Sequence, residues 1–254
     1  MSSFKMEQFD GTLLAARYAF MPNKLRYCGG DSNAELFAYT SANQSDAGLQ
    51  AMLKEFETMF PYLRLIAEAN KIADPFNYKV VEAYWLGNEL LENVSMNNFY
   101  RYLVDEQKLK KKFNPAILEK VFGKIPVGAK PHHSFHVLNI PKRTGHYPVE
   151  HSLKTMDECR ISPAIIREQK LENRNQVVVE YQPLVMVGSK LELGQPAEKE
   201  VFCEISQKAF VNELKVGDWL AIHWSWACDF LTETQVANLQ KWTKYNLSLA
   251  NLTM

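Results

Sequence analysis

One segment near the carboxyl end, residues 215–240, constrains the fold of this chain most strongly. It opens with Lys215-Val216-Gly217-Asp218, which predicts a turn because Gly217 can adopt a positive φ. The next stretch, Trp219 to Trp226, is mostly aromatic and aliphatic and predicts a buried strand. A helix is expected to begin at Thr232, since threonine is a common helix cap. The chain is therefore predicted to end in β structure closed by a helix.

The composition excludes several classes of protein. Of 254 residues, 46% are hydrophobic and 23% are charged, as in other globular proteins, and the formal net charge is zero. A neutral chain gives no reason to expect nucleic acid or an anionic membrane as a partner. No apolar run approaches the roughly 20 residues of a membrane helix, and the start lacks a signal-peptide pattern. We expect a cytoplasmic protein whose four cysteines are thiols.

The amino-terminal half is predicted to be helical. Apolar residues spaced three and four apart predict a helical bundle over residues 1–126. The first helix, Thr12 to Phe20, is expected to stop near Pro22. A longer helix is expected to begin after Asp46 and to be kinked or divided at Pro61. Its single apolar face consists of Leu49, Met52, Leu53, Phe56, Met59, Phe60, Leu63 and Ile66.

The pattern changes near Pro126. Residues 127–158 hold five of the six histidines and predict an irregular connection with one short strand, Ser134 to Ile140. From Cys159 onward, short apolar runs alternate with turn residues, and the expected strands are 161–169, 176–187, 190–193, 200–205 and 219–226. Five strands and a helix predict a small OB-like β-barrel with a C-terminal helix over residues 159–254. The whole chain is therefore predicted to be α+β, with the helical bundle first.

Two segments of the barrel region carry a recognisable pattern. Cys159 is followed after three residues by Pro163, and Leu214 to Ala227 reads LKVGDWLAIHWSWA. Together they resemble the small hydrogenase-assembly chaperones of the HypC/HupF type. Those proteins open with a cysteine, three residues and Pro-Gly-x-Val, and later read roughly V-K-V-G-D-Y-V-L-V-H-x-G-F-A. The similarity covers about a third of the chain, from Asp157 to Leu239.

The resemblance implies a role in the maturation of nickel-iron hydrogenase. Members of that family hold an iron that carries cyanide and carbonyl ligands, and pass it to the hydrogenase large subunit. By position, the family's essential cysteine corresponds to Cys159 and its strand histidine to His223. The resemblance thus implies an iron cofactor at these two residues, with the hydrogenase large subunit or another assembly factor as partner. The family cysteine is amino-terminal, whereas Cys159 is internal, so a role for a terminal amine is excluded.

The chemistry of this pair agrees with a metal site, although a structural alternative remains. A soft thiolate and a neutral imidazole suit iron. The alternative is a buried thiol beside a core histidine that bonds a carbonyl, because cysteine is among the most buried residue types. The chain as a whole also resembles an uncharacterised bacterial group whose members carry similar ARYAF, YCG, EAYW, PHHSFHV and HW-W-CD segments.

A histidine cluster forms a second candidate metal site. In a strand conformation, His132 and His136 would share one face and His133 would take the other. Imidazoles without carboxylates suit iron, zinc or copper. A third ligand would come from elsewhere in the chain, with candidates His146, His151, Cys28 and Glu150. The alternative is a polar edge of hydrogen-bonded histidines.

Two further residues are candidates for catalysis. Cys28 lies in a glycine-containing loop before a predicted helix, whose amino terminus would lower the pKa of its thiol. Residues 82–88 are expected to lie in the middle of a helix, where Gly87 costs about 1 kcal/mol relative to alanine and so suggests close packing or a bound group near Glu82. The alternatives are a packed loop cysteine and a helix contact through a small residue.

These observations give one leading hypothesis and two alternatives. The leading hypothesis is an accessory protein for nickel-iron hydrogenase that binds or transfers an iron group through Cys159 and His223. The second is a histidine-ligated metalloenzyme acting on a small molecule, with Cys28 and Glu82 near the metal and the barrel as scaffold. The third is a structural adaptor without a metal. The sequence does not decide whether the protein is an enzyme.

Overall fold

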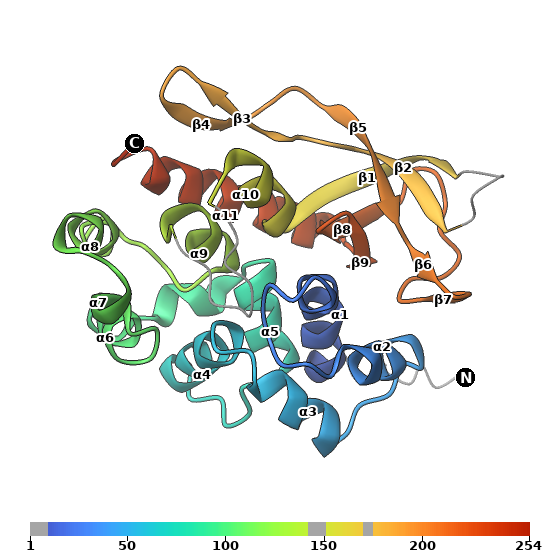
Figure 1. Ribbon diagram of the computed structural model, residues 1–254, viewed down its shortest axis with the longest axis horizontal. Helices are drawn as coiled ribbons and strands as arrows, with labels where there is room; N and C mark the ends of the chain where they lie inside the picture. Colours follow the sequence, from blue (N-terminus) through green and yellow to red (C-terminus); the bar gives the residue numbers. More distant parts are fainter. Residues whose placement is uncertain (1–9, 142–150, 170–174) are drawn as a thin grey trace, which may run out of the picture.

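The computed structural model describes residues 10–141, 151–169 and 175–254. Helices come first, strands next and a long helix last, so the predicted α+β class is confirmed (Figure 1). The amino-terminal helices are α1 (Gly11–Lys24), α2 (Asn33–Ser41), α3 (Ala47–Lys54), α4 (Met59–Ala69), α5 (Tyr78–Trp85), η1 (Glu89–Asn93), α6 (Met96–Asp105), α7 (Leu109–Lys112) and α8 (Pro115–Phe122).

The second half contains the strands and three further helices. The helices are α9 (His133–Asn139), α10 (Leu153–Cys159) and α11 (Glu233–Ala250). The strands are β1 (Ser162–Gln169), β2 (Gln176–Tyr181), β3 (Leu184–Val187), β4 (Lys190–Leu193), β5 (Ala197–Phe202), β6 (Glu204–Ile205), β7 (Lys208–Ala209), β8 (Trp219–His223) and β9 (Trp226–Phe230). Five of them pair in the closed order β1-β2-β5-β9-β8, while β3-β4 and β6-β7 form separate hairpins. Within the described residues, no helix is both long enough and apolar enough to cross a membrane.

Two of the helix predictions need correction. The helix predicted after Asp46 is two helices, and the break lies at residues 55–58 rather than at Pro61. Pro61 falls in the first turn of α4, where its missing N–H leaves no hydrogen bond unmade. Helix α1 likewise continues through Pro22 to Lys24 instead of stopping before it.

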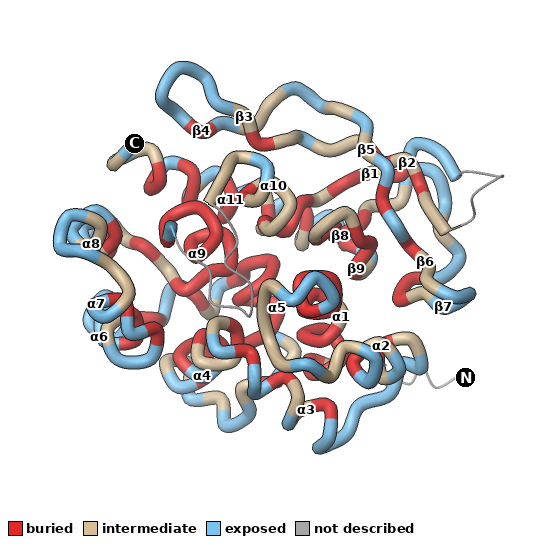
Figure 2. The backbone as a smooth tube through the Cα atoms, in the orientation of Figure 1, coloured by how far each residue is buried: buried red, intermediate tan, exposed pale blue. Residues whose placement is uncertain are grey.

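The histidine segment is a helix, so the predicted strand Ser134–Ile140 is wrong. His132 is the N-cap of α9, and its ring nitrogen Nδ1 accepts the Ser134 N–H at 3.1 Å. All seven residues of α9 are buried, so its sequence lacks the polar face that reveals most helices (Figure 2). On a helix, His133 and His136 are three residues apart and lie on neighbouring positions of one side.

Three of the predicted strands are also divided in the structure, and one of them, 200–205, is split at Cys203 between β5 and β6. Residues 176–187 form β2 and β3 with Pro183 between them, because proline cannot donate to a sheet. Residues 219–226 form β8, a two-residue turn and the first residue of β9. Trp224 and Ser225 in that turn have φ values of 53° and 55°, as a tight hairpin requires at both central positions.

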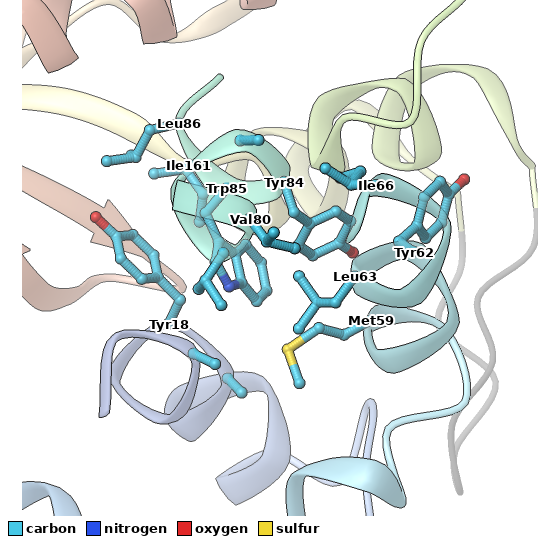
Figure 3. Close-up of a cluster of buried hydrophobic side chains, with 14 of the residues drawn as sticks. Tyr18, Met59, Tyr62, Leu63, Ile66, Val80, Tyr84, Trp85, Leu86 and Ile161 are labelled. Atoms are coloured by element: carbon cyan, nitrogen blue, oxygen red, sulfur yellow. The ribbon is translucent and has the colours of Figure 1, made fainter. Parts of the chain in front are cut away.

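The helical part and the sheet share one hydrophobic core. The largest buried cluster runs from Leu13 in α1 to Leu249 in α11 and includes Trp226 of β9. Phe20 of α1 packs edge-on against Trp226, with ring centroids 5.4 Å apart. In the close-up of Figure 3, Tyr84 and Trp85 of α5 lie between Tyr18 on one side and the α4 side chains on the other. The domain boundaries at residues 126 and 158 stay a prediction, and this core extends across them.

Candidate metal centre

Three metal-binding side chains converge where the helices meet the sheet. One ligand atom each from His133, Cys159 and His223 lies within 4.8 Å of the others, among the described residues. They come from the start of α9, the end of α10 and the end of β8. Three segments far apart in the sequence therefore supply the donor group, which we call the His-Cys-His group.

Hydrogen bonds orient the two imidazoles. The Nδ1–H of His223 donates to the Tyr18 carbonyl at 2.7 Å, so its Nε2 carries the lone pair that a metal needs. For His133, Nε2–H donates to the Cys159 carbonyl at 2.8 Å, and Nδ1 accepts from the Tyr84 hydroxyl at 3.2 Å. Metal ligation by His133 would replace one of these two hydrogen bonds, and the other would orient the ring, as partners of ligating histidines commonly do.

Glu158 fixes the distance between Cys159 and His223. Its backbone carbonyl accepts the Trp224 N–H at 2.7 Å, and its carboxylate accepts the Ser225 hydroxyl at 2.9 Å. The same carboxylate pairs with Lys199 at 2.7 Å. Glu158 precedes Cys159, and Trp224 follows His223, so one residue joins the two segments that carry a thiol and an imidazole. These contacts also support the left-handed backbone of the Trp224–Ser225 turn, which costs free energy and persists only where its surroundings impose it.

The burial of the group favours neutral imidazoles. Desolvation holds the pKa of His133 well below its usual value, and the nearby His223 lowers it further. Burial also raises the pKa of Tyr84 well above its usual value, so this phenol stays protonated and can donate to His133. The neutral imidazole is the form that binds metals, and His133 is therefore in its metal-binding form at neutral pH.

The group opens onto a small cavity of about 60 Å³. Most of its wall is apolar or aromatic, and none of the described residues that line it is a carboxylate. His133 and His223 are buried, whereas Cys159 is partly exposed. The lining consists of Pro22, Tyr27, Cys28, Phe56, Thr58, Met59, Tyr84, Trp85, His133, His136, Val137, Cys159, His223 and Trp224.

This arrangement can bind a transition metal with a position left open. One thiolate and two imidazoles suit zinc, iron, copper or nickel, and the absence of carboxylates from the group disfavours magnesium and calcium. Three protein ligands beside a cavity match the pattern of open metal sites, in which a fourth position takes water or another small ligand.

The structure separates the three histidines of the predicted cluster. His133 belongs to the His-Cys-His group, and His136 lines the same cavity with its Nδ1 3.3 Å from the Tyr62 hydroxyl. His132 lies apart, with its ring stacked on Trp242, and burial lowers its pKa to about 3. The expectation that His132 and His136 share a strand face is therefore wrong, because the segment is helical. His146 and Glu150 lie outside the described residues, and His151 is not part of the group.

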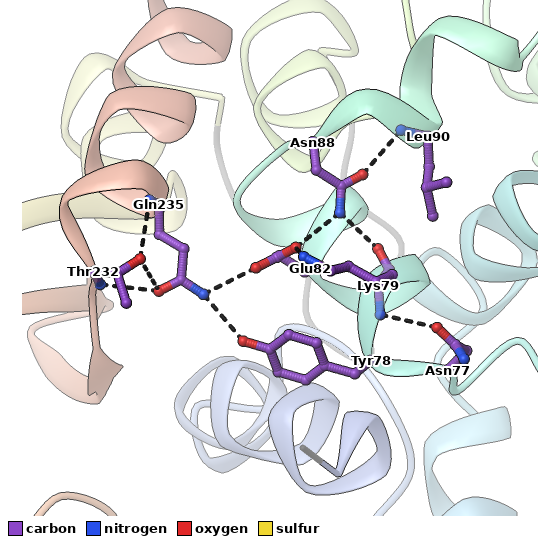
Figure 4. Close-up of polar contacts among 8 residues, drawn as sticks. All are labelled: Asn77, Tyr78, Lys79, Glu82, Asn88, Leu90, Thr232 and Gln235. Atoms are coloured by element: carbon purple, nitrogen blue, oxygen red, sulfur yellow. Dashed lines mark hydrogen bonds and ion pairs between the residues drawn. The ribbon is translucent and has the colours of Figure 1, made fainter. Parts of the chain in front are cut away.

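The two residues predicted for catalysis lie in different places. Cys28 lines the cavity. Glu82 does not: its carboxylate bonds Lys79, Asn88 and Gln235, all at 2.9–3.0 Å (Figure 4). Glu82 thereby links α5 to α11. The expected position mid-helix is also corrected, since α5 ends at Trp85 and Gly87 follows with φ of 86°.

The sequence alone did not identify the residues that orient the His-Cys-His group, although several of them lie in recognisable segments. Four of the segments that carry the resemblance to an uncharacterised group, ARYAF, EAYW, PHHSFHV and HW, supply Tyr18, Tyr84, His133 and His223. A fifth, YCG, supplies Cys28. The structure brings these scattered segments together around one cavity. Glu158 gave no comparable signal.

A larger hollow of about 550 Å³ lies beside α1 and β9, away from the histidines. Arg17 and Asp229 line it and form an ion pair at 2.9 Å. Its volume exceeds that of the cavity at the His-Cys-His group, but its wall contains no cysteine or histidine among the described residues. The metal-binding side chains therefore make the smaller cavity the candidate functional site.

Fold and site together define an α+β protein with a buried histidine-cysteine donor group at the contact between helices and sheet. The chain belongs to a family of unknown function, DUF6390, whose model matches residues 7–254. This finding confirms the expected membership of an uncharacterised family over the whole chain, and it gives no support to the narrower HypC/HupF resemblance. No curated protein and no solved structure matches the chain.

Proposed function

We propose that the protein binds a transition-metal ion through His133, Cys159 and His223, and serves as an accessory protein in the assembly of a nickel-iron hydrogenase. One observation carries the proposal: the thiol and the imidazole that the HypC/HupF resemblance singles out lie within 4.8 Å of each other, beside a cavity. His133 adds a third donor from the helical part, outside the barrel region that carries the resemblance. The metal would be iron, bound as cargo for the hydrogenase large subunit or another assembly factor.

The first test is metal binding by the purified protein. The wild type is expected to bind one equivalent of metal, while Cys159→Ala and His223→Ala each lose most of it, since thiolate and imidazole are the strong ligands here. Cys203→Ala is the matched control, because this thiol is buried in the barrel core away from the cavity. Elemental analysis after dialysis measures the outcome. Equal metal in wild type and Cys159→Ala would sink the proposal.

The second test addresses the hydrogenase role itself. The protein is expressed together with the machinery that makes the iron cyanide-carbonyl group, and its infrared spectrum is recorded. Cyanide and carbonyl stretching bands are expected in the wild type and should be lost in Cys159→Ala. If the protein binds metal but shows none of these bands, the metal site stands and the role in hydrogenase assembly is rejected.

A second candidate function is metal-dependent catalysis on a small molecule. It is favoured by the position of Cys28, which lines the same cavity as the His-Cys-His group. The volume of about 60 Å³ restricts a substrate to a few non-hydrogen atoms unless the cavity widens. Glu82 would take no direct part, because its carboxylate lies in the α5–α11 contact. Turnover that depends on Cys28 while the infrared bands stay absent would favour this candidate.

A further inference from the structure

Cys28 lies on the cavity wall but outside the His-Cys-His group. The group of mutually close ligand atoms contains three residues among those described, and Cys28 is not one of them. Cys28 nevertheless lines the cavity together with all three. It is partly exposed, as Cys159 is, whereas His133 and His223 are buried. Cys28 therefore stands on the cavity wall outside the group and reaches solvent more than the two imidazoles do.

The backbone around Cys28 is held in place by specific contacts. The Asn23 side-chain amide donates to the carbonyls of Cys28 at 2.9 Å and of Gly30 at 2.7 Å. Gly29 has φ of 79°, and a Cβ there would come within 2.5 Å of the Phe56 ring. The loop is thus packed closely against the helices, and this packing fixes the position of Cys28 on the cavity wall.

The same loop contacts the hairpin that carries His223. The Tyr27 ring lies 4.7 Å from the Trp224 ring, and both line the cavity and are only half-buried. Cys28 follows Tyr27, and His223 precedes Trp224. The two aromatic rings and Cys28 together form the outer rim of the cavity.

A metal cation that crosses this wall needs a ligand on the way. Leaving water for an apolar cavity costs a bare cation a large amount of free energy unless a ligand compensates. None of the described lining residues is a carboxylate, so the thiolate of Cys28 is the strongest donor on the cavity wall outside the His-Cys-His group. A change of its χ1 between staggered rotamers would swing the sulfur without moving the loop.

We infer that Cys28 is a rim ligand, which binds the metal first and hands it to the His-Cys-His group by ligand exchange; this rests on the proposed metal site. Cys28 binds the cation as a thiolate after its proton passes to water. The Cys28–metal bond then breaks as bonds to the Cys159 thiolate and the two imidazoles form. Cys159 gives its proton to water, Cys28 regains one, and no electrons are transferred.

The test compares the rate and the endpoint of cobalt uptake. Co²⁺ is mixed with full-length protein in a stopped-flow instrument, and the thiolate-to-cobalt charge-transfer band is followed. Cys28→Ser is expected to slow uptake, and release to a chelator, by about tenfold, within the one to three decades over which rates vary among mutants of one site. Its final band and cobalt stoichiometry should equal those of the wild type. Cys28→His should restore part of the rate, because imidazole is also a ligand.

One control and three adverse outcomes complete the test. Cys203→Ala should leave the rate unchanged, since this thiol is buried in the barrel core away from the cavity. Wild-type kinetics in Cys28→Ser would overturn the inference. A weaker final band in Cys28→Ser would also overturn it, because Cys28 would then be a permanent ligand. A wild type that takes up no cobalt would overturn the proposed metal site along with the inference.

Discussion

At the residue scale, Arg160 is a charged side chain that is buried directly after Cys159. It is 2% exposed, and both its Nε and one terminal nitrogen donate to the Asp157 carboxylate at 3.0 and 2.9 Å. Asp157 also accepts the Leu184 N–H at 2.8 Å and the Tyr181 hydroxyl at 3.0 Å. This network ties the end of α10 to the start of β3, and thereby holds the backbone on which Cys159 sits.

Removing Asp157 from its ion pair with Arg160 should destabilise the folded protein. Asp157→Ala is expected to lower the free energy of unfolding by about 3–5 kcal/mol, because it leaves the buried Arg160 charge without its carboxylate partner. Asp31→Ala is the matched control: its pair with Arg26 has the same length, 2.9 Å, but is exposed, so the change should be under about 1 kcal/mol. Urea unfolding measures both. Equal losses in the two variants would contradict the argument.

Lys124 gives a pH-dependent prediction. The residue is 4% exposed, and desolvation lowers its pKa from 10.5 to about 8, with a further contribution from Lys120. Between pH 8 and about 10.4 the unfolded chain holds this proton while the folded protein releases it, so this residue's contribution to stability rises with pH. Below pH 8 the buried charge destabilises the folded state.

Replacing Lys124 should therefore stabilise the folded protein most at neutral pH. Lys124→Met is expected to raise the urea midpoint relative to wild type at pH 7, and the gain should shrink as pH rises from 8 to 10. Lys111→Met, at an exposed position, serves as the control and should change little at either pH. A gain from Lys124→Met that is independent of pH would show that the ammonium charge is not the cause.

At the scale of elements, Gly87 brings α5 and α11 together. It follows the carboxyl end of α5 with φ of 86°, and its N–H donates to the Glu82 carbonyl at 2.9 Å. A Cβ at this position would lie 1.9 Å from the Trp242 ring of α11. The predicted contact through a small residue is thus present, as a helix end against an aromatic ring. The Glu82–Gln235 hydrogen bond joins the same two helices.

Two substitutions separate the contact of Gly87 with Trp242 from the free-energy cost of its left-handed backbone. Gly188→Ala, at φ of 61° with nothing within 4 Å, should lose only the roughly 1–2 kcal/mol of the left-handed conformation. Gly87→Ala should lose that amount and about 1–3 kcal/mol more through overpacking against Trp242. Thermal unfolding gives the difference. Similar losses at both positions would show that Trp242 moves aside freely.

At the scale of the whole molecule, the shared core predicts cooperative unfolding. Circular dichroism of the helices and tryptophan fluorescence, to which Trp219, Trp224 and Trp226 of the β8–β9 hairpin contribute, should follow one transition in urea. Phe20→Ala should shift both signals together and cost about 3–5 kcal/mol, since Phe20 is 1% exposed and contacts Trp226 of the sheet. Val216→Ala, 63% exposed, should leave the transition in place. Two separate transitions would instead support the predicted domain boundaries.

The sequence by itself determined the class of fold and part of the candidate site. Helical periodicity, capping residues and alternating strands are local signals, so the helix-then-strand order and the last helix after Thr232 could be predicted. Cys159 and His223 follow by position from the HypC/HupF resemblance. Their convergence was decided by the closed strand order, by Glu158 and by the Tyr18 carbonyl, none of which leaves a local pattern.

Only the tertiary structure decided that His133 is the third donor and that Cys28 lines the same cavity. Helix α9 is buried on every side, which erases the amphipathic pattern and made it resemble a strand. His133 is brought to the group because α9 packs against α11 and α5, so its role depends on contacts between elements that are far apart in the sequence. The position of Cys28 likewise follows from the packing of its loop on Trp224. Local patterns select elements, whereas a metal site depends on how distant elements pack.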